Sequence, residues 1–147
     1  MIPTNYDDGE EEDDGLSDFT VETEPSLTYA MRVSDLEKEP SIFVGKIDEE
    51  EAIRQSVFKI LSTERYSTPI YSWDYGVELS DLKGMPVDYV MSEIPNRITD
   101  ALTADDRIES CEDFEMERVG KKALHITFSV VTAEQEKIEG LETEVEY

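Results

Sequence analysis

The chain has 147 residues and a formal net charge of −24, with 37 acidic and 13 basic side chains. That length leaves room for one modest domain, and the charge disfavours direct nucleic-acid binding, which requires clustered lysine and arginine. The single cysteine, Cys111, and the single histidine, His125, exclude an internal disulfide and a Cys/His metal cluster.

Membrane insertion and export by a signal peptide are also disfavoured. No stretch approaches the roughly 18 consecutive apolar residues that a membrane-spanning helix needs, and the N-terminus lacks the basic and apolar regions of a signal peptide. We therefore expect a soluble protein with no membrane partner.

Both ends of the chain are strongly acidic. Residues 1–25 carry ten acidic and no basic side chains, so we expect either a disordered, solvated tail or an arm that becomes ordered against a basic partner. Residues 132–147 carry six glutamates against Lys137. We divide the chain into an acidic N-terminal arm, residues 1–25, and one domain with an acidic C-terminal end, residues 26–147.

Two short strands are predicted at the start of this domain. Residues 26–33 alternate apolar and polar positions, which is typical of a half-buried strand whose apolar side carries Leu27, Tyr29, Met31 and Val33. A polar connection at 35–40 follows. Residues 41–44 then predict a second strand that can pair with the first.

A helix and an aromatic loop come next. Asp48 is a candidate N-cap with Glu51 three positions later, and apolar residues recur at helical spacing over residues 49–62. Residues 64–76 are rich in aromatic and turn-forming residues, which predicts an ordered loop in which Gly76 supplies a positive φ.

A second helix is predicted to start at Pro86 and to keep its apolar stripe as far as Leu102. Pro95 lies inside it. Because an interior proline removes a backbone hydrogen bond and crowds the preceding turn, we expect a kink or a break near residues 91–93.

Two final strands are predicted at 108–119 and 123–131, joined by a Gly-Lys-Lys turn. Irregular alternation around Cys111 and Phe114 indicates a bulge in the first strand. The second alternates, with His125, Thr127 and Ser129 outward and with inward Leu124, Ile126, Phe128 and Val130. The element order predicts an α+β fold with two main helices packed on a mostly antiparallel sheet.

Few residues suggest catalysis. Glu64 lies near Tyr66 and Trp73, and aromatic surroundings can raise a carboxyl pKa, but pairing with an arginine or capping of the loop is the more common role for such a residue. His125 has no serine or cysteine motif around it and is interpreted as a surface histidine. We assign no catalytic residue, metal site or cofactor.

Two other features suggest binding. The aromatic residues of the loop either fill the core beneath it or anchor an interface, as Tyr and Trp often do; they are Tyr66, Tyr71, Trp73 and Tyr75. Arg107 follows two aspartates at the junction between the second predicted helix and the next predicted strand. It forms either a weak local ion pair in a turn or a buried or interfacial arginine fork.

Two segments carry a resemblance to a known family. Residues 53–66 (IRQSVFKILSTERY) and 69–76 (PIYSWDYG), with Leu79 and Leu82, resemble the sheath-initiator baseplate proteins of contractile phages, in particular those of prophages and phage-tail-like bacteriocins of Gram-positive bacteria. The likeness covers about residues 26–131. Related subunits occur in type VI secretion baseplates, and the family is sometimes labelled lysozyme-like although it is not known for hydrolysis.

The resemblance implies a structural role and a contact residue. In the family, a Glu-Pro-Arg motif contacts the helical core bundle of the baseplate wedge, and the matching place here reads Asp105-Asp106-Arg107. The arginine is kept, the glutamate is shortened and the proline is absent, so the contact transfers better to Arg107 than to Asp105.

The resemblance also implies partners. An open edge of the sheet is expected to accept extended arms from the first sheath ring. The partners would be the tail sheath subunit, baseplate wedge proteins and the tail tube, with several copies in a symmetric tail baseplate, assembled in the host bacterial cytoplasm.

Two alternative functions remain open. An acidic DNA-mimic inhibitor would explain the net charge, although mimicry needs charges fixed on a rigid surface and much of this charge lies at the two ends. A cell-wall hydrolase would use the abundant carboxylates, but no pair of them is selected by the sequence.

Overall fold

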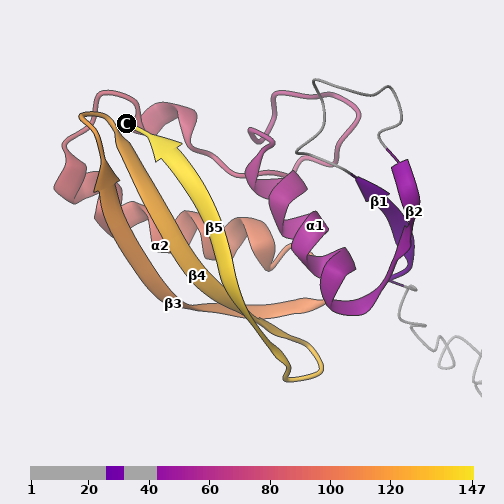
Figure 1. Ribbon diagram of the computed structural model, residues 1–147. Helices are drawn as coiled ribbons and strands as arrows, with labels where there is room; N and C mark the ends of the chain where they lie inside the picture. Colours follow the sequence, from indigo (N-terminus) through magenta and orange to yellow (C-terminus); the bar gives the residue numbers. More distant parts are fainter. Residues whose placement is uncertain (1–25, 32–42) are drawn as a thin grey trace, which may run out of the picture.

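The computed structural model describes residues 26–31 and 43–147 (Figure 1). The elements, in chain order, are β1 (Thr28–Met31), β2 (Phe43–Ile47), α1 (Glu49–Leu61), the 3₁₀ turn η1 (Ser80–Leu82), α2 (Val87–Leu102), β3 (Ile108–Val119), β4 (Ala123–Thr132) and β5 (Lys137–Glu146). The predicted α+β fold with mostly antiparallel strands is confirmed. The acidic arm and the polar connection at 35–40 lie outside the described residues.

The strands form two separate sheets. β1 and β2 pair antiparallel, as predicted, and β3, β4 and β5 form an antiparallel sheet in that order. Figure 1 shows these three long strands curving side by side, with α2 lying against one face of the sheet and α1 beside β5. Both helices therefore pack on the same core.

The centre of the core is the inward face of β4. Its four predicted core residues are at most 1% exposed; they are Leu124, Ile126, Phe128 and Val130. Ser129 was expected to face outward, but it is only 5% exposed because it lies beside the irregular β4–β5 register between Phe128 and Val130. The bulge predicted in β3 is present between Glu112 and Glu115.

The C-terminal end is a strand, which the sequence analysis missed. β5 pairs with β4 along its length and buries Ile138, Leu141 and Val145 in the core. These apolar residues do not alternate regularly, since Gly140, at φ 70°, lies at the register irregularity. The glutamates between them are therefore held on a rigid sheet rather than in a tail.

Helix α2 runs through Pro95 without interruption, so of the kink or break expected near residues 91–93, the break does not occur. Four residues on one face of α2 are fully buried, namely Val90, Ile94, Ile98 and Leu102. Burying a large aliphatic side chain contributes about 1.5–3 kcal/mol, so this row outweighs the roughly 3 kcal/mol penalty of an interior proline.

Helix α1 begins where the sequence predicts. The Asp48 carboxylate accepts a hydrogen bond from the backbone N–H of Glu49, and the Ser26 hydroxyl donates to the same carboxylate. The Ser26 hydroxyl and the Glu49 amide together lower the pKa of Asp48. The cap therefore ties the start of β1 to the start of α1.

The face of β1 that was expected to be half-buried is more exposed than predicted. Leu27 is 51% exposed and Tyr29 is 60% exposed, while Met31 is partly buried. Outside the β1–β2 sheet itself, the main neighbour of β1 is α1, so little of the main core covers this face. Val33 lies outside the described residues.

Candidate functional site

The turn between α2 and β3 holds a two-point ion pair, which we call the Arg107–Asp105 fork. Arg107 donates from Nε to Asp105 Oδ1 at 2.9 Å and from Nη2 to Asp105 Oδ2 at 2.6 Å. The Arg107 side chain is 24% exposed and that of Asp105 is 11% exposed. The arginine fork is thus formed within the turn itself, on a partly buried carboxylate.

The fork also joins three parts of the fold. The Ser56 hydroxyl on α1 donates to Asp105 Oδ2 at 2.9 Å, and the carbonyl of Arg107 accepts from the Ala133 amide, after β4, at 2.9 Å. Burial by itself raises the pKa of Asp105, but the hydrogen bonds from Arg107 and Ser56 outweigh it and hold that pKa below its usual value. The hydrogen bond to Asp105 raises the pKa of Arg107.

Two clefts flank the fork. One, of about 400 Å³, lies between the start of β1, helix α1 and Arg107. The other, of about 520 Å³, lies between the first turn of α1, Arg107 and the turn that joins β4 to β5. Arg107 lines both, so its side chain is accessible to a partner from two sides even though it is partly buried.

The aromatic loop divides its rings between core and solvent. Tyr75 packs against the core, and Tyr71 stacks on it with ring centroids 4.4 Å apart. Trp73 is 78% exposed, Tyr66 67% and Tyr71 42%. Tyr75 therefore fills the core beneath the loop, as one of the two interpretations expected, while an interface at the exposed rings stays a prediction.

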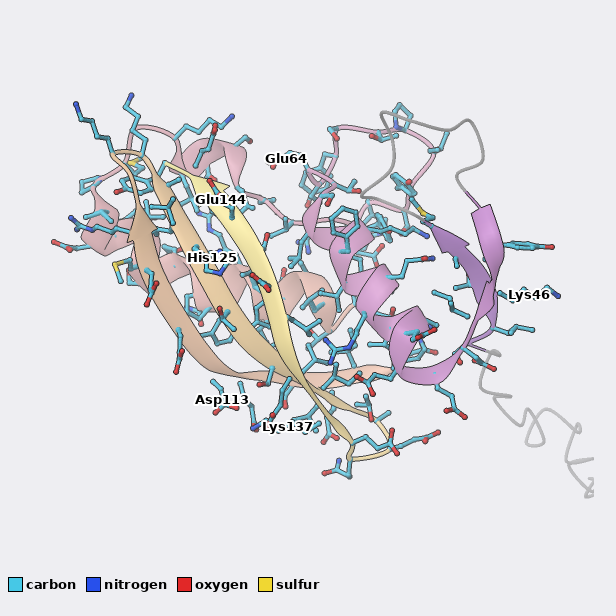
Figure 2. All side chains as sticks on the ribbon, viewed as in Figure 1. Lys46, Glu64, Asp113, His125, Lys137 and Glu144 are labelled. Carbon is cyan, nitrogen blue, oxygen red and sulfur yellow. The ribbon has the colours of Figure 1, made fainter. Side chains whose placement is uncertain are left out.

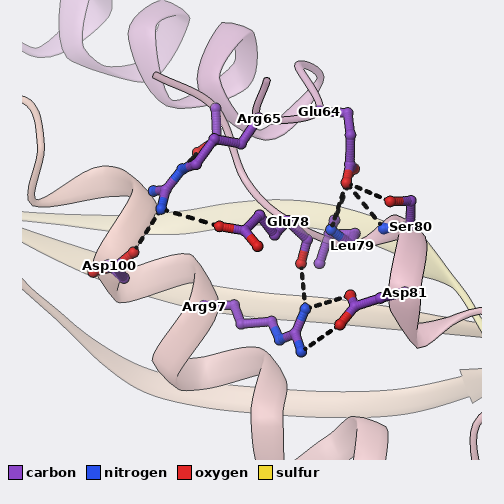
Figure 3. A network of polar contacts seen from close by, with 9 residues as sticks. Glu64, Arg65, Glu78, Leu79, Ser80, Asp81, Arg97 and Asp100 are labelled. Atoms are coloured by element: carbon purple, nitrogen blue, oxygen red, sulfur yellow. Dashed lines mark hydrogen bonds and ion pairs between the residues drawn. The ribbon is translucent and has the colours of Figure 1, made fainter. Parts of the chain in front are cut away.

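Glu64 has a structural position in this loop. Its carboxylate accepts hydrogen bonds from the backbone amides of Leu79 and Ser80 and from the Ser80 hydroxyl, the last at 2.7 Å. These donors lie at the start of η1, so Glu64 caps that turn (Figure 3). Capping was one of the two structural roles preferred for Glu64 from the sequence, the other being a pair with an arginine.

The two ends of the loop are held against each other. Gly76 adopts φ 100°, and a Cβ there would lie 2.6 Å from the carbonyl oxygen of Thr63. The amide of Val77 donates to that same oxygen at 2.9 Å, and the amide of Arg65 donates to Val77 at 3.0 Å. Glycine is therefore required at this close approach.

Two arginines that the sequence analysis did not single out connect α2 to the aromatic loop and to η1 (Figure 3). Arg97 pairs with Asp81 at 2.5 and 3.0 Å, and Arg65 pairs with Asp100 at 3.0 Å. Arg97 also donates to the carbonyl of Glu78. Only the pair of Arg97 with Glu93, at helical i,i+4 spacing and 3.6 Å, had a signal in the sequence.

The face of the main sheet opposite the helices is acidic. In register, His125 lies between Glu117 on β3 and Glu144 on β5, and Thr127 lies between Glu115 and Glu142. His125 Nε2 is 3.3 Å from Glu142 Oε2, and Figure 2 shows His125 beside Glu144. His125 thus lies at the surface with carboxylates around it, as a sheet residue rather than part of a nucleophilic arrangement.

Among the strands that the structure describes, none pairs with β5 on the side away from β4. This free edge is regular over its second half. The amide of Tyr147 donates to the carbonyl of Lys122 at 2.9 Å, and the register continues without a shift from there to Leu141. Because backbone groups in an antiparallel strand alternate in direction, the N–H and C=O groups of three residues point away from β4, namely those of Glu142, Glu144 and Glu146.

The first half of this edge is covered. Arg54 on α1 donates to the carbonyl of Glu139 at 2.8 Å. The opposite edge, on β3, is interrupted by the bulge around Asp113, which has φ 53° and pairs with Lys137 at 2.5 Å. The second half of β5 is therefore the longer uninterrupted edge.

Other chemistry has weaker support in the structure. Burial raises the pKa of the Cys111 thiol to about 11, which leaves it protonated and unreactive at neutral pH. Among residues 26–31 and 43–147, no group of three or more His, Cys, Asp or Glu side chains is arranged to hold a metal ion. None of the helices in the same part of the chain has the length and apolar character needed to cross a membrane.

Comparison with known proteins places the chain beside a family and a relative. The sequence model of a family described as contractile injection system sheath initiator matches residues 28–135, which run from β1 to the turn before β5. The phage-like element PBSX protein XkdS of Bacillus subtilis (strain 168) is 40% identical over 127 residues, which span 81% of this chain and 85% of that protein.

Proposed function

Because this chain belongs to the contractile injection system sheath initiator family, we propose that it joins the baseplate wedge to the tail and receives arms of the first sheath ring along β5. Its general role follows from the family: it is a structural component of a contractile tail. The finer assignment of surfaces to the sheath, the wedge and the tail tube is the proposal.

The observation that carries the sheath contact is the free edge of β5. Over its second half, three residues direct backbone donors and acceptors away from β4 in regular register. An extended chain can add to such an edge through main-chain hydrogen bonds, with little dependence on its side chains. This suits an arm that must be recognised by its backbone and held in a fixed direction.

The Arg107–Asp105 fork supports the wedge contact. Arg107 is preoriented by two hydrogen bonds to Asp105 and lines two clefts. A side chain that is already ordered loses less conformational entropy on binding. We assign Arg107 the direct contact and Asp105 the positioning of its guanidinium.

A non-enzymatic role accords with the position of Glu64. Its carboxylate accepts hydrogen bonds from the first residues of η1, which is a structural capping role. Clearing of a peptidoglycan suspension by the purified protein, abolished in Glu64→Gln, would contradict this role.

One observation favours the DNA-mimic alternative. Mimicry needs charges fixed on a rigid surface, and β5 holds its glutamates on the acidic face of the sheet. Binding to a DNA-binding enzyme that survives deletion of residues 1–24 would favour mimicry by the domain. Family membership favours the tail role, in which the protein sits in the baseplate of a phage or phage-tail-like particle after assembly in the bacterial cytoplasm.

Particles made with and without the gene test the proposal. Negative-stain electron microscopy of the deletion should show tail tubes or baseplates that lack a sheath, with normal sheathed tails restored by a plasmid copy. Normal sheathed tails without the gene would overturn it.

A further inference from the structure

The exposed side of the aromatic loop forms a small hollow that lies outside the wedge and sheath contacts proposed above. It has a volume of about 200 Å³ and is lined by Thr63, Glu64, Tyr66, Thr68, Pro69, Tyr71, Ser72, Trp73 and Tyr75. Drug-sized ligands occupy roughly 300 Å³ or more, so the hollow is suited to a single side chain. We propose that it binds an arginine side chain presented by a partner protein.

The lining favours a cation with a flat face. Four of the nine lining residues are aromatic, and none is basic. The one charged lining residue is Glu64, whose carboxylate is hydrogen-bonded to Leu79 and Ser80, so the aromatic rings are the main attraction for a cation. The face of an aromatic ring attracts a cation. A guanidinium also stacks on such rings and is more weakly hydrated than an ammonium, so arginine fits this lining better than lysine does.

The loop is ordered before any ligand arrives. Tyr71 is stacked on Tyr75, which packs against the core, and the Ser67 hydroxyl donates to the Glu64 carbonyl at 2.6 Å. Tyr66 adopts φ 65°, a left-handed conformation that is strained for a bulky residue. Such strain persists only where the surroundings impose it, and it is concentrated at functional sites.

The chain's own described arginines are engaged elsewhere. Each of them pairs with a carboxylate outside the hollow, in the pairs Arg54–Glu50, Arg65–Asp100, Arg97–Asp81, Arg107–Asp105 and Arg118–Asp88. The excess of acidic side chains over basic ones, 37 against 13, makes a basic partner the favoured one. The arginine is therefore expected from another protein.

Trp73 provides a direct assay, because it is the single tryptophan of the chain and lines the hollow. The full-length protein is titrated with the peptide acetyl-Gly-Arg-Gly-amide while Trp73 emission is followed at constant ionic strength. The matched peptides replace arginine with citrulline, which keeps the shape without the charge, or with leucine. The arginine peptide is expected to bind at least about fivefold more tightly than either, as a cation–π contact predicts.

Variants identify the site. Tyr66→Leu and Tyr71→Leu should each weaken binding of the arginine peptide several-fold, whereas Tyr89→Leu, at an exposed tyrosine on α2, should leave it unchanged. Circular dichroism of each variant establishes that it is folded. Equal binding of the citrulline peptide, tighter binding of the leucine peptide, or no saturation by about 50 mM, well above a millimolar dissociation constant, would each overturn the proposal. The assay needs no assembled tail, so its result is independent of the role in the sheath.

Discussion

Arg107 and Asp105 are two residues apart and hold each other through two parallel hydrogen bonds of 2.9 and 2.6 Å. This geometry restricts the guanidinium to one orientation beside two clefts. The same pair also links α1 to the α2–β3 turn through Ser56. A residue that serves both folding and recognition needs experiments that separate the two effects.

Arg107→Ala should leave the domain folded and weaken its association with the wedge. Loss of a charged hydrogen-bonding partner costs about 1–3 kcal/mol in stability, which urea denaturation measures. Co-purification with wedge proteins should fall by a larger factor than stability explains. Arg118→Ala is the control, since it removes the same charge from an exposed side chain with only a 3.9 Å ion pair. If Arg107→Ala co-purified with wedge proteins at the wild-type level, Arg107 would not be a wedge contact.

The pH dependence of stability should report the Arg107–Asp105 fork. The pKa of Asp105 is lower in the folded protein than in the unfolded chain, so its carboxylate stabilises the fold above about pH 3.9, its unfolded value. That contribution is lost as the pH falls through the folded pKa. The stability difference between the wild type and Asp105→Asn should thus be full at pH 6 and shrink below pH 4.

The measurement is urea denaturation from pH 6 to pH 3. Asp106→Asn is the control, because it changes the net charge equally at an exposed neighbouring position. A difference between wild type and Asp105→Asn that stays constant down to pH 3 would show that the Asp105 charge does not stabilise the fold.

Much of the fold could be predicted from the sequence. The elements that were not predicted were missed for physical reasons. The apolar residues of β4 alternate from Leu124 to Val130, so its inward residues were identified, although the burial of Ser129 was not. In β5 the apolar residues are Ile138, Leu141 and Val145, three and four residues apart, which is helical spacing rather than the period of a strand. The irregular register near Gly140 accounts for this departure from the alternation of a strand.

The same contrast holds for the site. Asp105 and Arg107 are near neighbours, so an ion pair between them was foreseeable. The pairs of Arg65 with Asp100 and of Arg97 with Asp81 join residues 35 and 16 positions apart. They depend on how the loop packs against α2, which local spacing does not encode. Exposure of individual rings in the aromatic loop was unpredictable for the same reason.

Gly76→Ala should destabilise the domain more than Gly84→Ala. Both glycines have positive φ, 100° and 86°, but an added Cβ meets the Thr63 carbonyl oxygen at 2.6 Å only at Gly76, with nothing within 4 Å at Gly84. Backbone strain alone costs about 1–3 kcal/mol at either site, and the clash adds about 1–3 kcal/mol. Thermal or urea denaturation of the two variants gives the comparison, and equal losses would mean that the loop ends can separate freely.

Glu144→Pro should block sheath initiation without unfolding the domain. The N–H of Glu144 points away from β4 and bonds no strand in the described part of the chain, so proline there removes a donor from the free edge only. Thr143→Pro, one residue earlier, removes an N–H directed at β4 and should destabilise the sheet. Glu144→Gln separates the loss of charge from the loss of the donor. Complementation of the gene deletion, scored by electron microscopy, should give sheathed tails with Glu144→Gln and none with Glu144→Pro. Sheathed tails with a folded Glu144→Pro protein would place the sheath arms on a different edge, because a strand cannot add in register where the receiving N–H is missing.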